Sequence, residues 1–233
     1  MKLYNTIQGG IFHARPNRFI AEVDVGGQLE LCHVKNTGRC KELLIPGTRV
    51  YINRSDKIER VTKYDLVVVW KGERLVNMDS QAPNKVFLEY LQSGKYIKDI
   101  THIKPEAKYG DSRYDFYIET AKRKIFIEVK GVTLEADNIA MFPDAPTQRG
   151  IKHLQGLTCC ISDGFESHVV FVIKMNGIKH FSPNYATHPE FGTALVAAEK
   201  AGVKISAVDC IVTPDSLTIR NPVHINMGGA ATC

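Results

Sequence analysis

Three residues near the middle of the chain, Asp115, Glu128 and Lys130, have the types and spacing of a metal-dependent phosphodiesterase site. Glu128 and Lys130 stand two residues apart in the run IFIEVK. Side chains of a β-strand alternate between its faces, so these two project from the same face. Asp115 lies in the preceding run YDFYIE, which a short connection through Ala121 and Lys122 joins to the first. The sequence therefore predicts a β-hairpin that carries two carboxylates and one ammonium.

The register of this hairpin is predicted to bring the two carboxylates together. If the hairpin is centred between Ala121 and Lys122, Asp115 lies directly opposite Glu128. Directly opposed residues have Cβ atoms ~4.5–5.5 Å apart, so the carboxylates would repel each other unless a cation lay between them. Mg²⁺ or Mn²⁺ suits such a site, because these ions bind through one or two carboxylates plus water and phosphate oxygens. Lys130 would orient the attacking water or stabilise charge on the phosphoryl oxygens.

The structural alternative is a solvent-facing edge hairpin in which Lys130 only neutralises a carboxylate. Further strands are predicted on both sides of the hairpin, so its strands should be interior to a sheet. This position, together with the register, favours the functional interpretation.

Two further carboxylates are candidates to complete the metal site. Glu106 precedes the predicted turn at residues 108–113, and Glu89 lies on a short predicted helix, although residues at such positions are more often on the surface. The letters PD also occur at Pro143 and Asp144, but this segment follows the ExK run instead of preceding it. We therefore assign the aspartate of the motif to Asp115, and expect Asp144 to begin the next helix or turn.

The elements that must position these residues fall into two parts. From residue 19 to about 76, short alternating runs separated by turn residues predict four or five β-strands, with a hairpin turn at Gly26-Gly27. Such short strands bury both faces most simply by curling into a small barrel, such as an OB-fold. The sequence predicts an OB-fold-like nucleic-acid-binding domain over residues 1–83.

Residues 84–233 predict a mixed-sheet α/β domain. Asn84 is expected to cap a short helix that Gly94 ends. A capping box at Thr187 and Glu190 is expected to begin a later helix that runs to Lys200. The remaining predicted elements are strands at 100–104, 114–119, 124–130, 168–173 and 204–212 and a helix at 147–157.

Two groups of basic and polar residues are predicted to contact nucleic acid. Helical spacing places one group on a polar stripe of the helix after the motif, and we expect Arg149 and His153 to face the same cleft as Glu128. The other group surrounds the first barrel strands and the following loop, where OB-folds bind nucleic acid. A solvated helix face and a set of turn residues are the structural alternatives. The first group comprises Gln148, Arg149, Lys152 and His153, and the second Arg15, Arg18, His33, Lys35, Asn36, Thr37, Arg39 and Lys41.

The composition of the chain fits a polyanionic partner. Its formal net charge of +5 would raise the local concentration of nucleic acid, although enzymes of small anions are often as basic. The six cysteines form no CxxC pair, which indicates reduced thiols in a cytoplasmic protein and argues against a Cys-ligated zinc site. No stretch approaches the ~20 apolar residues of a membrane span. The oligomeric state is left open, with a homodimer among the alternatives.

Several blocks of the sequence, in the same order, resemble the sugar fermentation stimulation protein A family. The resemblance covers nearly the whole chain. It implies a prokaryotic DNA-binding protein with an OB-like barrel followed by a PD-(D/E)xK, restriction-endonuclease-like domain. Carried over by position, it makes Asp115, Glu128 and Lys130 the nuclease motif, with Tyr114 in place of the motif's proline. The blocks are RPNRF (15–19), NTGRCKELLIPG (36–47), SRYDF (112–116), IEVKGVTL (127–134) and FPDAPTQRGIKHL (142–154).

Three functions compete on these observations. The first is a metal-dependent deoxyribonuclease. The second is a non-catalytic DNA-binding regulatory protein that keeps the nuclease fold and is linked to sugar metabolism. The third, a hydrolase of small phosphates, would leave the basic barrel loop unexplained. Retention of Asp115, Glu128 and Lys130 favours the first, because a protein that only binds DNA has no need for two opposed carboxylates near a phosphate.

Overall fold

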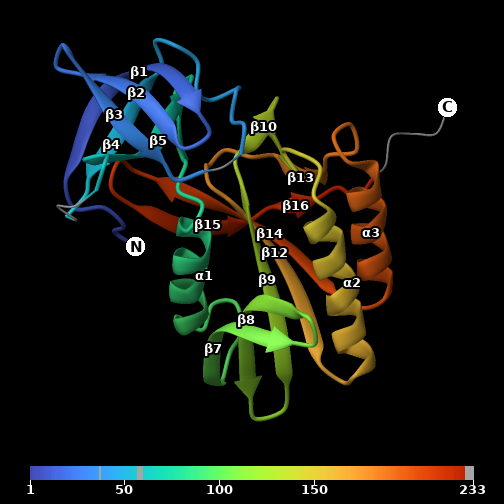
Figure 1. Cartoon of the computed structure of the whole chain (residues 1–233). Helices are drawn as coiled ribbons and strands as arrows, with labels where there is room; N and C mark the ends of the chain where they lie inside the picture. The colour runs from blue at the N-terminus through green and yellow to red at the C-terminus, as the bar shows by residue number, and fades with distance from the viewer. Residues whose placement is uncertain (37, 57–59, 229–233) are drawn as a thin grey trace.

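In the computed structural model, which describes residues 1–36, 38–56 and 60–228, a β-barrel stands against one end of a larger α/β domain (Figure 1). The barrel strands run in the order β3-β2-β1-β4-β5, and parallel pairing of β3 with β5 closes the ring. This closed five-stranded arrangement confirms the predicted OB-fold. The strands of this part are β1 (Ile7–Asn17), β2 (Ile20–Val25), β3 (Gln28–Val34), β4 (Arg49–Arg54), β5 (Tyr64–Lys71) and its extension β6 (Arg74–Asn77).

The local sequence accounts for the turn between β2 and β3 but does not predict strand β1. Gly26 and Gly27 have φ angles of 63° and 87°, as a two-residue turn between β2 and β3 requires. By contrast, β1 has no counterpart among the predicted strands. Its run IQGGIFHARPN is poor in apolar residues and buries only Phe12, so hydrophobic periodicity gives no signal for it.

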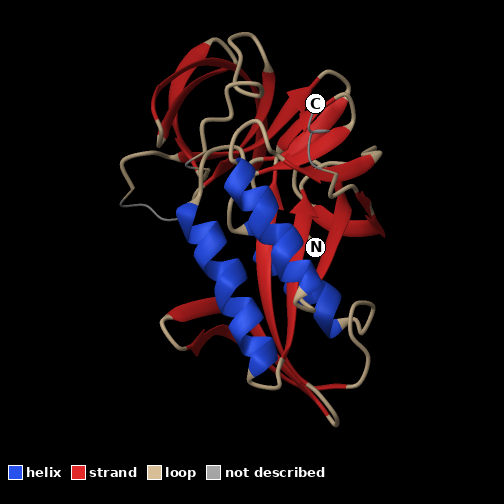
Figure 2. Cartoon of the chain, turned by 90° about the vertical axis from the view of Figure 1, so that its right-hand side faces the viewer, coloured by secondary structure: helices blue, strands red, loops and turns tan. Residues whose placement is uncertain are grey.

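The larger domain is built on a six-stranded sheet of order β15-β14-β12-β9-β8-β7. Strands β7, β8 and β9 form an antiparallel meander, and β12 and β14 continue the sheet in parallel. Helix α1 covers one face, whereas α2 and α3 lie side by side on the other (Figures 1 and 2). This arrangement confirms the predicted mixed-sheet α/β domain. The elements are α1 (Ala82–Gln92), β7 (Ile100–Tyr109), β8 (Ser112–Thr120), β9 (Lys124–Val132), α2 (Gln148–Ser162), β12 (Glu166–Ile173), α3 (Pro189–Lys200), β14 (Lys204–Val212) and β15 (Leu217–Pro222).

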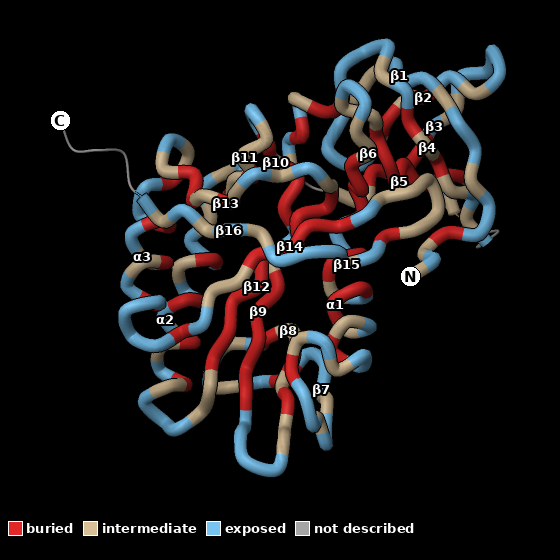
Figure 3. The backbone as a smooth tube through the Cα atoms, turned by 180° about the vertical axis from the view of Figure 1, so that it is seen from behind, coloured by how far each residue is buried: buried red, intermediate tan, exposed pale blue. Residues whose placement is uncertain are grey.

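Apolar side chains on both faces hold this sheet between its helices. Strand β12 is buried over almost its whole length, as expected of a parallel strand covered on both sides (Figure 3). Val169 and Phe171 belong to the core cluster that includes α2 and α3, while Val170 and Val172 belong to the cluster beneath α1. The alternating side chains of β12 therefore contact α2 and α3 on one face of the sheet and α1 on the other.

A small third sheet lies at the junction of the two parts. It comprises β10 (Leu134–Ala136), β11 (Ile139–Phe142), β13 (His180–Pro183) and β16 (His224–Ile225). Two cations of the barrel bind to it: Lys71 pairs with Glu135 at 2.5 Å, and Arg74 donates to the side-chain oxygen of Asn138 at 2.6 Å. These contacts tie the barrel to the α/β domain.

Both predicted helix caps are wrong. Helix α1 begins at Ala82 with Gln81 as its N-cap, because Pro83 is already suited to the first helical turn. Helix α3 has His188 as its N-cap and no side-chain capping bond. The Thr187 hydroxyl, predicted to cap α3, instead accepts a hydrogen bond from Asn184.

The first residues of the chain pack on the α/β domain although they precede the barrel. The amino group of Met1 donates to the carbonyl oxygen of Leu217 at 3.0 Å and pairs with Glu89 at 3.2 Å. Between the two parts, β6 ends at Asn77 and α1 begins at Ala82, two residues before the predicted start of the second domain at Asn84. Among the described residues, no helix has the length and apolar character needed to cross a bilayer.

Candidate active site and nucleic-acid interface

The hairpin that carries the motif lies inside the sheet, with β7 and β12 as its outer neighbours. Its register is the predicted one, since Phe116 pairs with Ile127. The backbone pairing of β8 with β9 ends at these two residues, however, and does not include the predicted pair of Asp115 and Glu128. Asp115 Oδ2 instead accepts a hydrogen bond from the backbone N–H of Val129 at 2.7 Å. The Asp115 carboxylate thus occupies the position that a backbone carbonyl would take if the ladder continued.

Glu128 is the buried centre of the site, with 4% of its surface exposed. Its Oε1 accepts from Lys130 Nζ at 2.6 Å and lies 2.5 Å from His153 Nδ1. Burial alone would raise the pKa of Glu128, but the hydrogen bond from His153 and the adjacent Lys130 outweigh it and lower that pKa. The other oxygen, Oε2, is buried without a hydrogen-bond partner in the described structure. Glu128 is therefore an ionised carboxylate with one oxygen available for a ligand.

Asp115 is held beside Glu128 from another direction. Its Oδ1 accepts from Asn84 Nδ2 at 2.6 Å, in addition to the Val129 N–H bond of Oδ2. Burial and, next, the negative charge of Glu128 raise the pKa of Asp115 to about 6, against the opposing effect of both hydrogen bonds. The two carboxylates are thus close enough to repel each other, and a cation bound between them would remove that repulsion.

These two residues fit a divalent cation that prefers oxygen ligands. Oε2 of Glu128 has no hydrogen-bond partner in the described structure, and burial and the charge of Glu128 disfavour the ionised form of Asp115. A bound cation would provide a partner for the first and stabilise the charge of the second. Within the described part of the chain, no three His, Cys, Asp or Glu side chains are grouped closely enough to hold a metal ion. Glu106, considered as a third ligand, is 64% exposed and pairs with Arg113 at 3.7 Å. Any further ligands would therefore be water or phosphate oxygens, as is usual for Mg²⁺.

The raised pKa of Asp115 predicts that Asp115→Asn stabilises the metal-free protein at pH 7. Since the folded-state pKa lies above the unfolded value, keeping this group charged costs stability, and the cost is fully present above pH 6. Removing the charge should raise the free energy of unfolding by about 1–2 kcal/mol. Denaturant titrations with chelator at pH 7 and pH 4 would measure this. The gain should shrink at pH 4, where the folded protein already carries the proton, and an equal gain at both pH values would contradict the assigned cause.

His153 positions Glu128 and is not available for DNA, which corrects its predicted role. It is 6% exposed and lies on α2. Its Nε2 accepts from Arg149 Nε at 3.3 Å, so the remaining ring proton resides on Nδ1 and is donated to Glu128. Tyr114, at the position of the motif's proline, lies against the imidazole with ring centroids 5.9 Å apart. Gln148, Arg149 and Lys152 are the exposed members of the predicted stripe.

Arg15 organises the barrel loop that was predicted to bind DNA. Its guanidinium donates to four backbone carbonyl oxygens at 2.7–2.8 Å, which belong to Arg18, Asn36, Gly38 and Arg39. With these donors engaged, Arg15 has no free N–H fork for a phosphate in this conformation. Arg15, which was predicted to contact phosphate, instead holds the backbone of the loop that carries Arg39 and Lys41.

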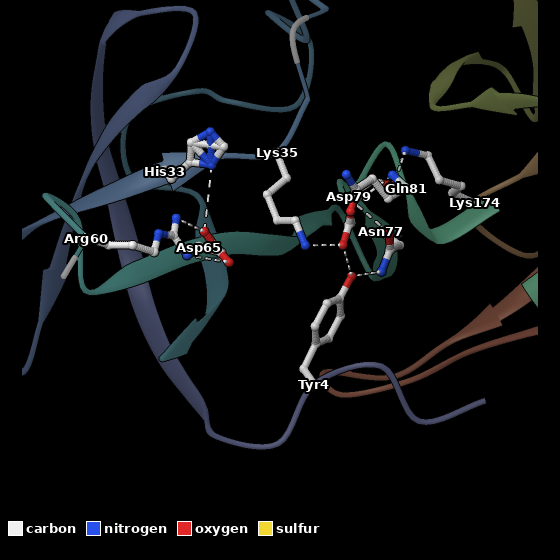
Figure 4. Close-up of polar contacts among 9 residues, drawn as sticks. All are labelled: Tyr4, His33, Lys35, Arg60, Asp65, Asn77, Asp79, Gln81 and Lys174. Atoms are coloured by element: carbon white, nitrogen blue, oxygen red, sulfur yellow. Dashed lines mark hydrogen bonds and ion pairs between the residues drawn. The ribbon is translucent and has the colours of Figure 1, made fainter. Parts of the chain in front are cut away.

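The other predicted barrel contacts divide into engaged and free side chains. Lys35 is engaged with buried Asp79 at 2.7 Å, and His33 lies 3.7 Å from Asp65, which also binds Arg60 (Figure 4). Burial lowers the pKa of His33. Asn36 has a turn role, because its side-chain oxygen accepts from Gly38 N. Thr37 lies outside the described residues. The exposed cations of this surface are Arg18, Arg39 and Lys41.

Asn84 is the site residue that the sequence did not reveal. Its amide was interpreted as a helix cap, whereas it holds Asp115, a residue 31 positions away. Nothing local to Asn84 signals that contact.

The fold and the site together define a class of protein: an OB-fold barrel joined to a restriction-endonuclease-like domain whose motif carboxylates are the buried Glu128 and the half-buried Asp115. Residues 14–78 match the family model described as the SfsA N-terminal OB domain, and residues 81–216 match the sugar fermentation stimulation protein RE domain. The chain belongs to the sugar fermentation stimulation protein (SfsA) family, which confirms the resemblance found in the sequence.

Relatives share this architecture over nearly their full length. Sugar fermentation stimulation protein homologs of Clostridium beijerinckii and Desulfitobacterium hafniense strain Y51 are each 56% identical, covering 95% and 96% of this chain and 98% of each relative. The solved structure of Pyrococcus furiosus SfsA in complex with Ca²⁺ is 28% identical, with a TM-score of 0.87 over 97% of this chain and 99% of that one.

Proposed function

We propose that the chain binds DNA and cleaves phosphodiester bonds with Mg²⁺ or Mn²⁺ held by Asp115 and Glu128. The observation that carries this proposal is the pair itself: a buried Glu128 oxygen without a hydrogen-bond partner among the described residues, beside an Asp115 whose pKa is raised by burial and by the negative charge of Glu128. The Pyrococcus furiosus relative was solved with Ca²⁺, a divalent cation that also prefers oxygen ligands, which supports the type of ion.

The residues around the pair have distinct roles in this proposal. When bound, the ion would polarise the phosphoryl oxygens and favour the hydroxide form of an attacking water. Lys130 uses one N–H on Glu128, which leaves other donors for a phosphate oxygen or for the water. His153 keeps Glu128 ionised and oriented, and Asn84 does the same for Asp115. These supports position the ligands before substrate arrives, which reduces the reorganisation that the reaction needs.

The DNA surface in this proposal has two exposed parts. Arg39 and Lys41 are exposed on the loop that Arg15 holds, and Lys152 and Arg149, which donates to His153, are exposed on α2. We infer that the protein acts on cytoplasmic DNA. The five cysteines that the structure describes are free, which supports a reducing compartment; Cys233 lies outside the described residues.

The test of the proposed function is incubation of the purified chain with single-stranded, duplex and branched DNA, with Mg²⁺ or Mn²⁺ and, separately, with chelator. Cleavage of at least one DNA form is expected only with metal. Absence of metal-stimulated cleavage on every form would replace the enzyme by a regulatory DNA-binding protein.

Phosphate contacts of the barrel loop predict a steep salt dependence of DNA binding. Replacing both Arg39 and Lys41 with alanine should weaken binding about tenfold or more at low salt. Each lost phosphate contact should also reduce the slope of log affinity against log salt by about 0.9. The control removes Lys122 and Lys124, which are exposed on the distant β8–β9 turn. Fluorescence anisotropy over a salt series would measure both, and equal losses in the two double variants would contradict a loop interface.

A further inference from the structure

A separate cavity lies where the barrel meets the α/β domain. Its volume is about 390 Å³, within the ~300–1,000 Å³ typical of ligand pockets. The barrel loop contributes Asn36 and Gly38, the segment after Lys130 contributes residues 131–134, and the segment before α2 contributes residues 141–147. Neither Asp115 nor Glu128 lines it.

The buried lysine of this cavity lacks a counter-ion. Lys174, just beyond β12, is 2% exposed, and its ammonium donates one hydrogen bond, to the backbone oxygen of Asp79 at 3.2 Å. No carboxylate of the described residues forms an ion pair with it: the carboxylate of Asp79 binds Lys35 and the N–H of Gln81 (Figure 4). Among the described residues, two of its three N–H groups have no acceptor. Because buried charges in proteins are normally paired, this cation has an unmet need for negative charge.

The protonation of Lys174 is consistent with that unmet need. Burial lowers the pKa of Lys174 to about 8, although Cys40, Asp79, Asp144 and Cys210 act in the opposite direction. An anion in the cavity would favour the charged form.

The positive end of α2 faces the same space. Thr147, the N-cap of this 15-residue helix, lines the cavity. Helix geometry leaves the N–H groups of Gln148 and Arg149 without acceptors inside the helix, and such N-termini favour phosphate. Gly131, which also lines the cavity, packs so closely that a Cβ there would lie 2.7 Å from Pro83 Cγ and 3.6 Å from Lys174 Cε.

One carboxylate also lines the cavity and opposes an anion. Asp144 is exposed, so solvent screens its charge, whereas the charge of Lys174 is buried and acts at nearly full strength. The balance of the site is therefore positive, with Asp144 at its rim.

We propose that this cavity binds the phosphate group of a phosphate monoester, with the Lys174 ammonium and the first N–H groups of α2 as donors. The volume beyond the phosphate accommodates the esterified group. The same chemistry is offered by the 5′-phosphate end of DNA and by a small phosphorylated molecule. The proposal goes beyond the nuclease function, because it uses none of the motif residues.

Calorimetry on the metal-free full chain would test it with inorganic phosphate, a nucleoside 5′-monophosphate and a 5′-phosphorylated oligonucleotide. The last two are compared with their unphosphorylated counterparts. The parent should bind phosphate, and Lys174→Met should lose at least tenfold in affinity while Lys122→Met, on a distant surface, loses nothing. Methionine has nearly the shape of lysine, and replacing a buried charge by an apolar group is often neutral or stabilising, so folding should survive.

A second variant keeps the inference testable if Lys174→Met fails to fold. Asp144→Asn leaves Lys174 in place and should raise phosphate affinity two- to fivefold, because it removes the opposing charge. A preference for the phosphorylated oligonucleotide would identify a DNA-end site, and selective binding of the monophosphate a small-molecule site. Absence of phosphate binding by the parent, or affinity unchanged by both substitutions, would overturn the proposal. Because no divalent metal is present, this outcome is independent of whether the chain cleaves DNA.

Discussion

Glu128→Gln is expected to lower metal-dependent DNA cleavage by a factor of about 10³ or more, and to remove most divalent-metal binding. The substitution keeps the shape of the side chain but replaces a charged oxygen ligand by a neutral amide. It also disturbs the bonds from Lys130 and His153, which are placed to donate to a carboxylate. Gel-based cleavage assays and calorimetric titration with Mg²⁺ would measure the two effects.

The matched control is Glu106→Gln, the same chemical change on an exposed carboxylate of the same domain. It should leave cleavage and metal affinity within about twofold of the parent, as is usual for surface changes. DNA binding without metal should survive Glu128→Gln and even strengthen, because a negative charge near phosphate is lost. Cleavage that persists in Glu128→Gln, or that falls equally in both variants, would remove Glu128 from the active site.

The variant Lys130→Ala distinguishes an effect on the cleavage step from an effect on metal binding. Because its ammonium touches Glu128 without being a ligand, Lys130→Ala should leave metal affinity largely intact while lowering the cleavage rate. The contrast between Lys130→Ala and Glu128→Gln therefore distinguishes a residue that acts on the reacting phosphate from one that holds the ion.

The sequence was sufficient to predict the hairpin and its register, because both follow from local rules. Strand alternation places Glu128 and Lys130 on one face, and a short connection fixes which residues pair, as Phe116 and Ile127 show. The position of Asp115 could not be obtained in this way. Backbone pairing of its strand with β9 ends at Phe116, and its carboxylate binds a backbone N–H and the side chain of Asn84, which belongs to α1.

Long-range partners account for the other differences. Helical periodicity correctly groups Arg149 with His153, but it does not say that His153 is covered by the sheet and bonded to a carboxylate. Basic residues near a loop were predicted to contact phosphate, yet Arg15 satisfies carbonyl oxygens up to 24 positions away. Composition identifies cations, whereas the packing of distant segments decides which of them remain free.

Arg15→Met is expected to destabilise the barrel and to weaken DNA binding more than any single exposed cation does. The guanidinium makes four charge-assisted hydrogen bonds to carbonyl oxygens. Such bonds contribute about 1.5–3 kcal/mol each when buried and less when exposed, so a loss of about 2–4 kcal/mol of unfolding free energy is expected. DNA affinity should fall more than tenfold, because Arg39 and Lys41 lose the loop conformation that presents them.

The control for this prediction is Arg18→Met, which removes the same charge from the same surface. Arg18 is exposed, and its guanidinium lies over the Phe19 ring at 4.6 Å. An exposed contact of this kind contributes about 0.5–1 kcal/mol, so Arg18→Met should change stability little and affinity modestly. Thermal and chemical unfolding, with anisotropy at one fixed salt concentration, would compare the two variants. Both lose one positive charge, so a difference between them isolates the loop-organising role of Arg15. Identical behaviour would show that Arg15 acts through its charge alone.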